Sequence, residues 1–471
     1  MTKILFSIHR MLWGVPALVM ILGVGVWLSL RTGFAQLRLF PQAVRYFLRQ
    51  LSGRQPESEG VSPFQALCTA LAATVGTGNL VGVAGAICLG GPGSVFWMWV
   101  CALFGMMTKF AEVTLAVRFR VPKNGETLGG PMYIILRGMG EKWRSLASAY
   151  CVFGVIAAFG VGNAAQINAV ISGIHGLLEP FAIAATTRRD LAFGLILAVL
   201  VGTMLLGGAK RIGAAAERLV PFAAGAYILL CLVVLAMHAE AIPGALRAVF
   251  RGAFSPGAVT GGVIGSGFAA LRTGCSRGVF TNEAGMGTAS IAHASARTDH
   301  PAQQGLLGIM EVFLDTIVIC TMTALVILTS GVSIPYGRDA GGELTIAAFA
   351  AACGGWSRGF LAAAMCCFAF ATVLGWGLYG ARCAQFLFGG NAWTAFALLQ
   401  TLTVIAGAVM NTQTVWLLAE IVNGLMAIPN LAALAYLSHE VVRLTIEYKT
   451  KSDETIVSGG NHADIYQCKP L

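Results

Sequence analysis

Polar and apolar positions divide this chain into long apolar runs separated by short polar loops. A helix needs about 20 apolar residues to cross a bilayer, so the runs predict transmembrane spans. We expect eleven spans, at 12–30, 62–89, 93–117, 147–177, 190–209, 218–238, 260–296, 305–330, 359–388, 392–410 and 413–438. No polar loop is long enough for a soluble domain, and we expect the polar tail 447–471 to lack regular structure.

Two of the expected spans contain material that does not suit a continuous helix. Residues 74–82 read TVGTGNLVG, and the run 260–296 holds eight glycines and the motif TNEAGMG at 281–287. Each interior glycine costs a helix about 1 kcal/mol relative to alanine. Backbone groups that unwind within hydrocarbon must be satisfied inside the protein. Both spans are therefore predicted to be broken helices.

The positions of the two breaks predict an internal repeat. When the first span is set aside, the broken spans are the first and sixth of the remaining ten. Interrupted spans at corresponding positions of two halves indicate a transporter built from inverted repeats. We expect an N-terminal anchor and loop at 1–60, five-helix repeats at 61–240 and 241–440, and a tail at 441–471.

Composition and charge agree with a polytopic membrane protein. The chain is 56% hydrophobic and 11% charged, against about 25% charged in an average soluble protein. Its net charge of +10 comes from short loops, which indicates topology and excludes a nucleic-acid partner. Twenty Lys and Arg residues fall in one set of alternate loops and eight in the other, so we expect the N-terminus outside and the C-terminus in the cytoplasm. The first span lacks an evident cleavage site and is read as a retained anchor.

Several classes of protein are excluded by missing motifs. The twelve cysteines show neither zinc-type nor disulfide-type spacing and act as small hydrophobes. The stretch GTGNLVG is spaced G-x-G-x-x-x-G and follows no strand, so it is not a dinucleotide loop. No Walker A lysine, HExxH or GxSxG motif occurs. We therefore expect neither an enzyme nor an ATP-driven pump.

A break at residues 74–82 would supply groups that suit a zwitterion. The unwound end of a half-helix presents N–H groups, which favour an anion such as a carboxylate. The end of the preceding half-helix presents carbonyls, which suit a small hard cation. The alternative is that Gly76, Gly78 and Gly82 only allow helices to pack closely.

Further polar residues lie inside apolar runs. Placing the charged side chain of Glu283 within the membrane costs about 2.5 kcal/mol or more unless it faces a cavity or a partner. Arg272 and Arg277 are candidate partners. The role of Glu283 is either structural or in substrate binding. Asn282 could accept hydrogen bonds from an ammonium group. The other candidates are Asn163, Gln166 and Asn168, as interhelical or substrate contacts; Lys109 and Glu112, as an i,i+3 ion pair; His293, as a hydrogen-bonded structural residue; and Asp315 and Glu420, without an assigned role.

Four motifs resemble one known family over residues 10–445. They are ALCTALAATVGTGNLVGVAGAICLGGPGSVFWMW (66–99), GGPMY (129–133), RGVFTNEAGMGTASIAHA (277–294) and HPAQQG (300–305). They are similar to the alanine or glycine:cation symporter family. The resemblance implies an all-α LeuT-type fold of two inverted five-helix repeats with one extra N-terminal helix.

The same resemblance implies a function. It implies alternating-access uptake of alanine or glycine with Na⁺, occasionally H⁺, in the bacterial cytoplasmic membrane. The expected partners are this small substrate and membrane lipid, with no obligate protein partner evident. The alternatives are a symporter for another small neutral amino acid, such as serine or glutamine, and a passive channel for small polar solutes.

The resemblance also implies roles for particular residues. It assigns substrate binding to Thr77, Gly78, Asn79, Gln166, Asn282, Gly285 and Trp376, with backbone N–H of Thr77 and Gly78 on the carboxylate and Trp376 as a pocket wall. It places Na⁺ between the carbonyls of Ala72 and Val75 and the side chain of Thr372.

The chain departs from the family pattern beside the expected ion site. It reads AFAT where the family usually reads AFST, so Ala371 removes a hydroxyl. It also reads GWGLYGA where GWSYYGE is usual, and GMGTAS where GMGSAP is usual. These departures leave the coupling ion and the substrate open at this point.

Overall fold

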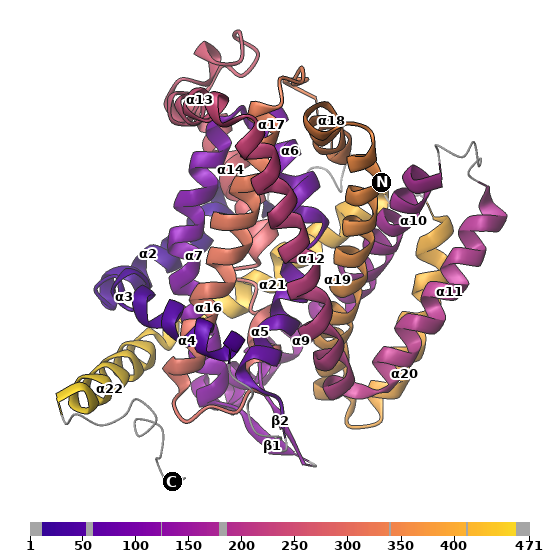
Figure 1. Cartoon of the computed structure of the whole chain (residues 1–471). Helices are drawn as coiled ribbons and strands as arrows, with labels where there is room; N and C mark the ends of the chain where they lie inside the picture. The colour runs from indigo at the N-terminus through magenta and orange to yellow at the C-terminus, as the bar shows by residue number, and fades with distance from the viewer. Residues whose placement is uncertain are drawn as a thin grey trace.

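The computed structural model describes residues 12–52, 60–123, 125–178, 186–338, 341–410 and 413–457. These residues are almost entirely helical, with one short β-hairpin (Figure 1). The strands β1 (Val121–Lys123) and β2 (Glu126–Leu128) pair antiparallel, with Val121 opposite Leu128. The expectation of an all-α membrane fold is confirmed, with the hairpin as a local exception.

The helices follow one another with short connections. In the first half they are α2 (Val15–Arg31), α3 (Ala35–Arg38), α4 (Phe40–Ser52), α5 (Pro63–Thr74), η1 (Gly78–Gly82), α6 (Val83–Gly90), α7 (Gly93–Arg118), α8 (Pro131–Tyr133), η2 (Ile134–Met139), η3 (Glu141–Trp143), α9 (Arg144–Phe159), η4 (Gly160–Ala164), α10 (Ala165–Leu178), α11 (Thr187–Leu206) and α12 (Gly208–Met237). They continue as η6 (Ala239–Ala241), α13 (Ile242–Phe254), η7 (Pro256–Ala258), α14 (Gly267–Asn282), α15 (Thr288–His293), α16 (Pro301–Val312), η8 (Phe313–Cys320), α17 (Thr321–Thr329), α18 (Gly341–Cys353), α19 (Trp356–Phe388), α20 (Ala392–Val409), α21 (Gln413–Tyr436) and α22 (Ser438–Val457).

Each expected span coincides with a helix or a broken helix. Among the described residues, seven helices are long and apolar enough to cross a membrane alone. Counting two bent pairs as single spans raises the number to nine. One pair joins Pro63–Thr74 to Gly78–Gly90 at 52°, and the other joins Glu420–Tyr436 to Ser438–Lys451 at 61°. The 17-residue helix α2 and the interrupted pair α14 and α15 occupy the remaining two expected spans.

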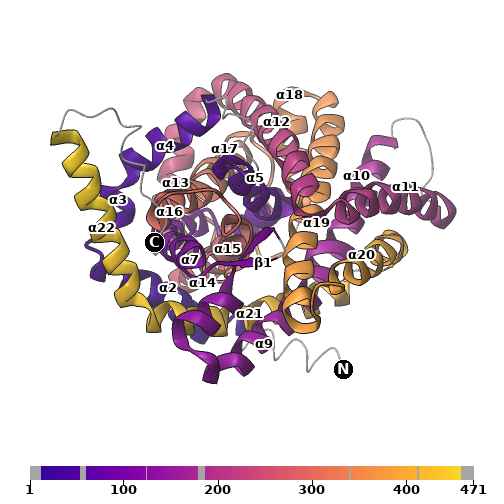
Figure 2. The same cartoon turned by 90° about the horizontal axis from the view of Figure 1, so that it is seen from below.

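The expectation of an irregular tail is wrong for residues 447–457. They continue α22, which projects from the lower left of Figure 1 and runs past α2, α3 and α4 in Figure 2. Charge pairs one turn apart support this helix, since Arg443 bonds both Glu440 and Glu447. Arg118 of α7 also donates to Glu440, at 3.0 Å, which anchors the helix. Residues 458–471 lie outside the described residues.

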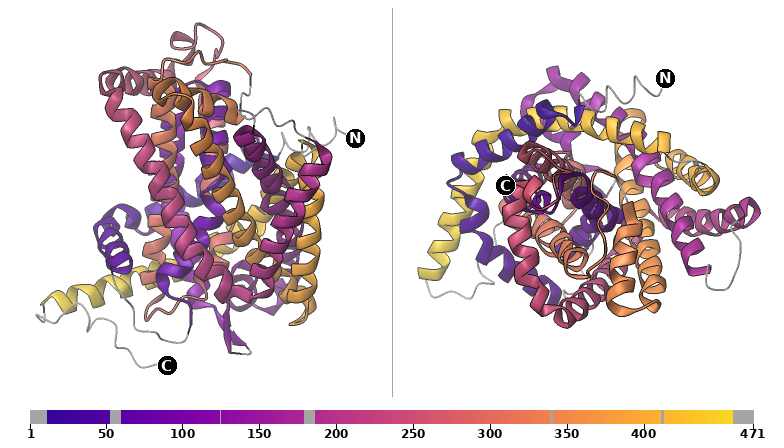
Figure 3. Two further views of the ribbon diagram at one scale, coloured as in Figure 1. Left: turned by 45° about the vertical axis from the view of Figure 1, so that its right-hand side comes forward. Right: turned by 90° about the horizontal axis from the view of Figure 1, so that it is seen from above.

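The helices form a central group and an edge group, which lie side by side. The two broken helices pack with α7 and α16 in the middle of the molecule, whereas α11 and α20 form one edge of it (Figures 2 and 3). The long helix α19 packs against α10, α9, α12 and α5 and so joins the groups. Both breaks consequently face the interior of the protein.

The loop charges used for orientation lie at opposite ends. The hairpin and the C-terminal helix occupy one end, and α13 and α18 occupy the other (Figure 1). Lys3, Arg10, Arg54 and Lys469 entered the count but lie outside the described residues. The end that carries the hairpin is the one to which the charge count assigns the cytoplasm.

Candidate functional site

The interruption expected at TVGTGNLVG is present. Helix α5 ends at Thr74, Val75 is extended (φ −77°, ψ 98°), and the chain resumes as the π-helical turn η1. In a continuous helix the Gly76 amide would donate to the Ala72 carbonyl. It donates instead to Asn79 Oδ1 at 2.8 Å. The sequence of glycines and polar residues thus unwinds the helix where the backbone finds a side-chain partner.

Asn79 stabilises this break through hydrogen bonds to a residue that is distant in the sequence. Its Nδ2 donates to Asp315 Oδ1 at 2.7 Å and to the Asp315 carbonyl at 3.3 Å. The side chain is fully buried. Its contacts therefore tie the first broken helix to η8. Asn79 was predicted to contact the substrate, but it does not line the cavity of about 600 Å³ that lies beside the break.

A cavity of about 600 Å³ lies against the break. Thr77 and Gly78 line it from one side, and Ala165, Phe280 and Met365 line it from α10, α14 and α19. The first amides of a helix have no partner within it. Among the described residues, the backbone hydrogen bonds outside the helices do not use the amide of Thr77 or of Gly78 as a donor. Both residues that carry these N–H groups line the cavity.

Gln166 bonds to the side chain of Thr77 and is not among the residues that line the cavity. Thr77 Oγ1 donates to Gln166 Oε1 at 3.2 Å, and Gln166 Nε2 donates to the Val161 carbonyl at 3.2 Å. The other two amides of this segment make interhelical bonds, with Asn163 on the Gln400 carbonyl at 2.7 Å and Asn168 on the Met410 carbonyl at 3.4 Å. Asn168 also lines the cavity.

The two broken helices meet at Gly78. A methyl group at this glycine would lie 3.3 Å from Thr281 Cγ2 and 3.8 Å from the Phe280 ring. Helix α14 ends directly after these residues, at Asn282. The last carbonyls of a helix lack intrahelical donors and carry partial negative charge. The start of one half-helix and the end of another thus lie together at the cavity.

The second break turns its own polar groups into the protein. Glu283 adopts a left-handed conformation (φ 53°) and ends α14, and Gly285 and Gly287 follow with φ of +96° and +78°. Asn282 Oδ1 accepts from the Ala284 amide at 3.0 Å, and its Nδ2 donates to Thr316 Oγ1 at 3.1 Å. The Gly285 amide donates to Glu112. Neither Asn282 nor Gly285 lines the cavity.

Glu283 has partners other than the arginines considered from the sequence. Thr288 Oγ1 donates to one carboxylate oxygen at 2.5 Å, and Trp376 Nε1 donates to the other at 3.1 Å. Arg272 instead lines a second pocket, and Arg277 lines both that pocket and the cavity beside the first break. Trp376 is fully buried and packs so closely on Gly162 that a methyl group there would lie 2.3 Å from its Cβ. It is not among the residues that line the cavity.

Thr372, one of the three residues expected around Na⁺, lies close to the first break. A methyl group at Gly76 would lie 2.8 Å from Thr372 Oγ1, which shows how near α19 approaches the break that follows Ala72 and Val75. Thr372 donates its hydroxyl to the Phe368 carbonyl at 3.0 Å, so its oxygen lone pairs remain available. Carbonyl and hydroxyl oxygens are the ligands that hard cations prefer. The residues present fit a small cation, with the buried Ala371 adding no oxygen.

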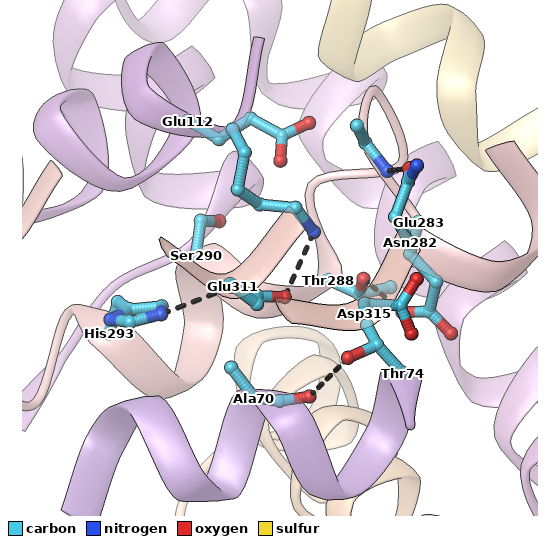
Figure 4. A network of polar contacts seen from close by, with 12 residues as sticks. Ala70, Thr74, Glu112, Asn282, Glu283, Thr288, Ser290, His293, Glu311 and Asp315 are labelled. Atoms are coloured by element: carbon cyan, nitrogen blue, oxygen red, sulfur yellow. Dashed lines mark hydrogen bonds and ion pairs between the residues drawn. The ribbon is translucent and has the colours of Figure 1, made fainter. Parts of the chain in front are cut away.

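A buried polar network connects the helices behind both breaks (Figure 4). The expected Lys109–Glu112 pair is wrong, because Lys109 Nζ pairs with Glu311 Oε1 at 3.2 Å. His293 is hydrogen-bonded, as expected, with Nε2 on Glu311 Oε2 at 3.2 Å and Nδ1 on Gln304 at 2.8 Å. Sequence reasoning missed Glu311, although an acid within the apolar run 305–330 was a usable signal.

Comparisons with known proteins agree with the fold and show the family. The chain matches the model of the sodium:alanine symporter family over residues 1–459. It is 42% identical over 447 residues to the sodium/alanine symporter AgcS of Methanococcus maripaludis, covering 93% of this chain and 95% of that protein. It is 38% identical over 444 residues to the probable sodium/glutamine symporter GlnT of Bacillus subtilis, covering 93% and 89%.

A solved structure supports the architecture. The crystal structure of MhsT in complex with L-phenylalanine matches with a TM-score of 0.55 at 14% identity, covering 84% of this chain and 99% of that one. This likeness shows the LeuT-type fold, in agreement with the resemblance found in the motifs. From its helices, its fold and its family match across the whole length, this chain is a multi-pass membrane transporter and belongs to the sodium:alanine symporter family.

Proposed function

We propose that this protein is a secondary active symporter that imports alanine or glycine together with Na⁺ by alternating access in the bacterial cytoplasmic membrane. The observation that carries the proposal is the first helix break. Its residues Thr77 and Gly78 line a cavity of about 600 Å³, and its Gly76 lies against Thr372. One unwound segment thus offers both an anion site and a cation site.

The substrate carboxylate binds at Thr77 and Gly78 in this proposal. Their amides point out of the start of a half-helix that extends to Gly90, and the helix dipole favours negative charge there. The Thr77 hydroxyl and Gln166 already form a polar pair beside these amides. On carboxylate binding, the Gln166 side chain can turn its N–H₂ group toward the anion.

The substrate ammonium binds at the end of α14. The carbonyls of Phe280 and Thr281 belong to the last turn of this helix, and these residues contact Gly78. Val81, Ala165 and Met365 then surround the side chain of the substrate with apolar groups, which favours a small neutral amino acid.

Sodium binds first and orders the break. Ala72, Val75 and Thr372 supply oxygens, and an ion between them fixes α5 against α19 with the neighbouring amides in place for the carboxylate. Binding to a segment that is already ordered costs less conformational entropy, so the ion raises the affinity for the substrate. This order of binding couples the downhill entry of Na⁺ to the uptake of the amino acid.

The arrangement of contacts at the two ends corresponds to an outward-facing state. The cavity reaches Glu343 and Arg358 at the end that carries α13 and α18. At the opposite end the Arg297 amide donates to the Val61 carbonyl at 3.0 Å, and Arg120 donates to the Ala296 carbonyl at 2.6 Å. Opening these contacts and closing the cavity would release the substrate inside.

Uptake into vesicles that contain the purified protein tests the proposal. We expect an inward Na⁺ gradient to drive accumulation of labelled alanine above its outside concentration, and competition by glycine more than by serine or glutamine. Stronger competition by glutamine would favour the alternative substrate class. Equilibration without accumulation, indifferent to imposed Na⁺ and pH gradients, would indicate a passive channel and contradict symport.

A further inference from the structure

The second helix break is organised around one carboxylate. Glu112 of α7 is fully buried, and its Oε1 accepts three hydrogen bonds. The donors are the Gly285 amide at 2.9 Å, the Gly287 amide at 3.0 Å and Asn430 Nδ2 at 2.7 Å. All three groups are donors that converge on one oxygen, which is how proteins hold a bound carboxylate.

The surroundings fix the turn that presents these amides. Gly285 and Gly287 both have positive φ, and a methyl group at Gly287 would lie 2.4 Å from Pro131 Cγ and 2.6 Å from Asn430 Oδ1. Asn430 Nδ2 also donates to the Gly285 carbonyl at 2.9 Å. Helix α21 and Glu112 thus hold the turn from two sides and fix its conformation.

Glu112 acts on the site through this turn. Glu283 and Thr288 flank the turn and bond to each other across it, and Glu283 also accepts from Trp376. Loosening the turn would therefore move the end of α14, whose Phe280 lines the cavity. Glu112 lies outside that cavity and reaches the end of α14 through the backbone amides that it holds.

The two breaks differ in what satisfies their amides. At the first break a neutral amide, Asn79, accepts from Gly76, and the amides of Thr77 and Gly78 stand at the cavity. At the second break a carboxylate of the protein accepts from the amides of Gly285 and Gly287. One break is open to an anion from outside, and the other already contains an anion.

We propose that Glu112 is a positioning residue that serves as the built-in anionic ligand of the second break. Of the two breaks, this leaves only the first for the carboxylate of the substrate, so Glu112 fixes the direction in which an amino acid binds. The part that concerns the substrate rests on the proposed function. The part that concerns the protein, a carboxylate-binding turn filled by Glu112, does not.

Replacing the side chain and supplying a free carboxylate tests the proposal. In Glu112→Ala we expect alanine uptake to fall about tenfold or more, as happens when hydrogen bonds to a buried charged group are lost. Sodium formate should restore uptake in part, and formamide, its neutral counterpart, should not. In the absence of alanine, formate should also raise the melting temperature of purified Glu112→Ala by more than that of the wild type, in which only the first break is open to an anion.

The two readouts separate the possible failures. Stabilisation by formate without any alanine transport by the wild type would uphold the inference and defeat the proposed function. Absence of both rescue and stabilisation would overturn the inference. If Glu112→Ala does not fold, Glu112→Gln retains an oxygen acceptor of the same shape and must still show a raised KM for alanine with a smaller change in kcat. A Glu112→Gln protein with the KM of the wild type would overturn the proposal.

Discussion

Three successive residues at the first break have three different environments. The Gly76 amide bonds Asn79, the Thr77 hydroxyl bonds Gln166, and Gly78 contacts α14. A side chain at Gly76 would collide with Thr372, and one at Gly78 would intrude on the contact between the two broken helices. The glycines are therefore needed for close approach as well as for unwinding.

The hydroxyl of Thr372 provides a test at the scale of one residue. We expect Thr372→Val, which keeps the shape and removes the oxygen, to raise the Na⁺ concentration for half-maximal uptake about tenfold, since losing one polar contact costs about 1–3 kcal/mol. Ala371→Ser adds a hydroxyl beside it and should lower that concentration. The measurement is alanine uptake as a function of Na⁺ concentration.

A matched control is available away from the break. Thr323 is also buried and bonds Tyr227 at 2.7 Å, so Thr323→Val removes a buried hydroxyl without touching the proposed ion site. It should reduce stability and leave the Na⁺ dependence unchanged. An unchanged Na⁺ dependence in Thr372→Val would exclude this residue as an ion ligand.

The sequence revealed several buried polar residues that need partners, but not which groups those partners are. Asn79, Glu283 and Lys109 stand out because a polar group in an apolar run must be satisfied somewhere. Their partners Asp315, Trp376 and Glu311 are each 93 or more residues away in the chain. Which of several distant groups is reached depends on how helices pack, and no local pattern contains that information. The role of Glu112 could not be predicted from the sequence for the same reason, because its partner Asn430 lies 318 positions away.

At the scale of elements, apolar length predicted the helices well. The spans at 93–117 and 392–410 agree with α7 and α20 to within one residue, because the requirement of crossing a bilayer sets both length and composition. Helix α22 was missed because its polar sequence carries no such requirement. Its stability comes from charge pairs along the helix and from its contact with α7, and only the former could be read from the sequence.

The hairpin between α7 and α8 supports a test of the contacts that close the end of the protein on which it lies. Glu126 of β2 pairs with Arg382 of α19 at 2.7 Å, with Arg382 nearly buried and stacked 5.0 Å from the ring centre of Trp393. Because Glu126 is half exposed, we expect Glu126→Gln to cost only about 1 kcal/mol. That is enough to open the inner end more often, and the labelling rate of a cysteine at Ser295, which lines a small pocket there with Arg382, should rise several-fold.

Two comparisons make this test specific. Glu141→Gln breaks an exposed pair with Arg144 near the same end and should leave the labelling rate unchanged. The double exchange Glu126→Arg with Arg382→Glu should return the rate toward that of the parent protein. If Glu126→Gln and Glu141→Gln label equally, the hairpin has no part in closing the inner end.

At the scale of the whole molecule, the two breaks lie at corresponding positions of the chain and are filled differently. The first has amides at a cavity and the second holds its own carboxylate. The arrangement is consistent with two halves of similar architecture in which one break binds ligands and the other is fixed. A zwitterion and a cation can then share one segment of backbone, and each should bind more tightly when the other is present.

Measuring this mutual dependence tests most directly whether one unwound segment holds both ligands. The dissociation constant of alanine is measured on purified protein with saturating Na⁺ and with none, and that of Na⁺ is measured with and without saturating alanine. If one segment holds both, each ligand should lower the dissociation constant of the other by the same factor, about tenfold. An alanine dissociation constant that is the same with and without Na⁺ would contradict it.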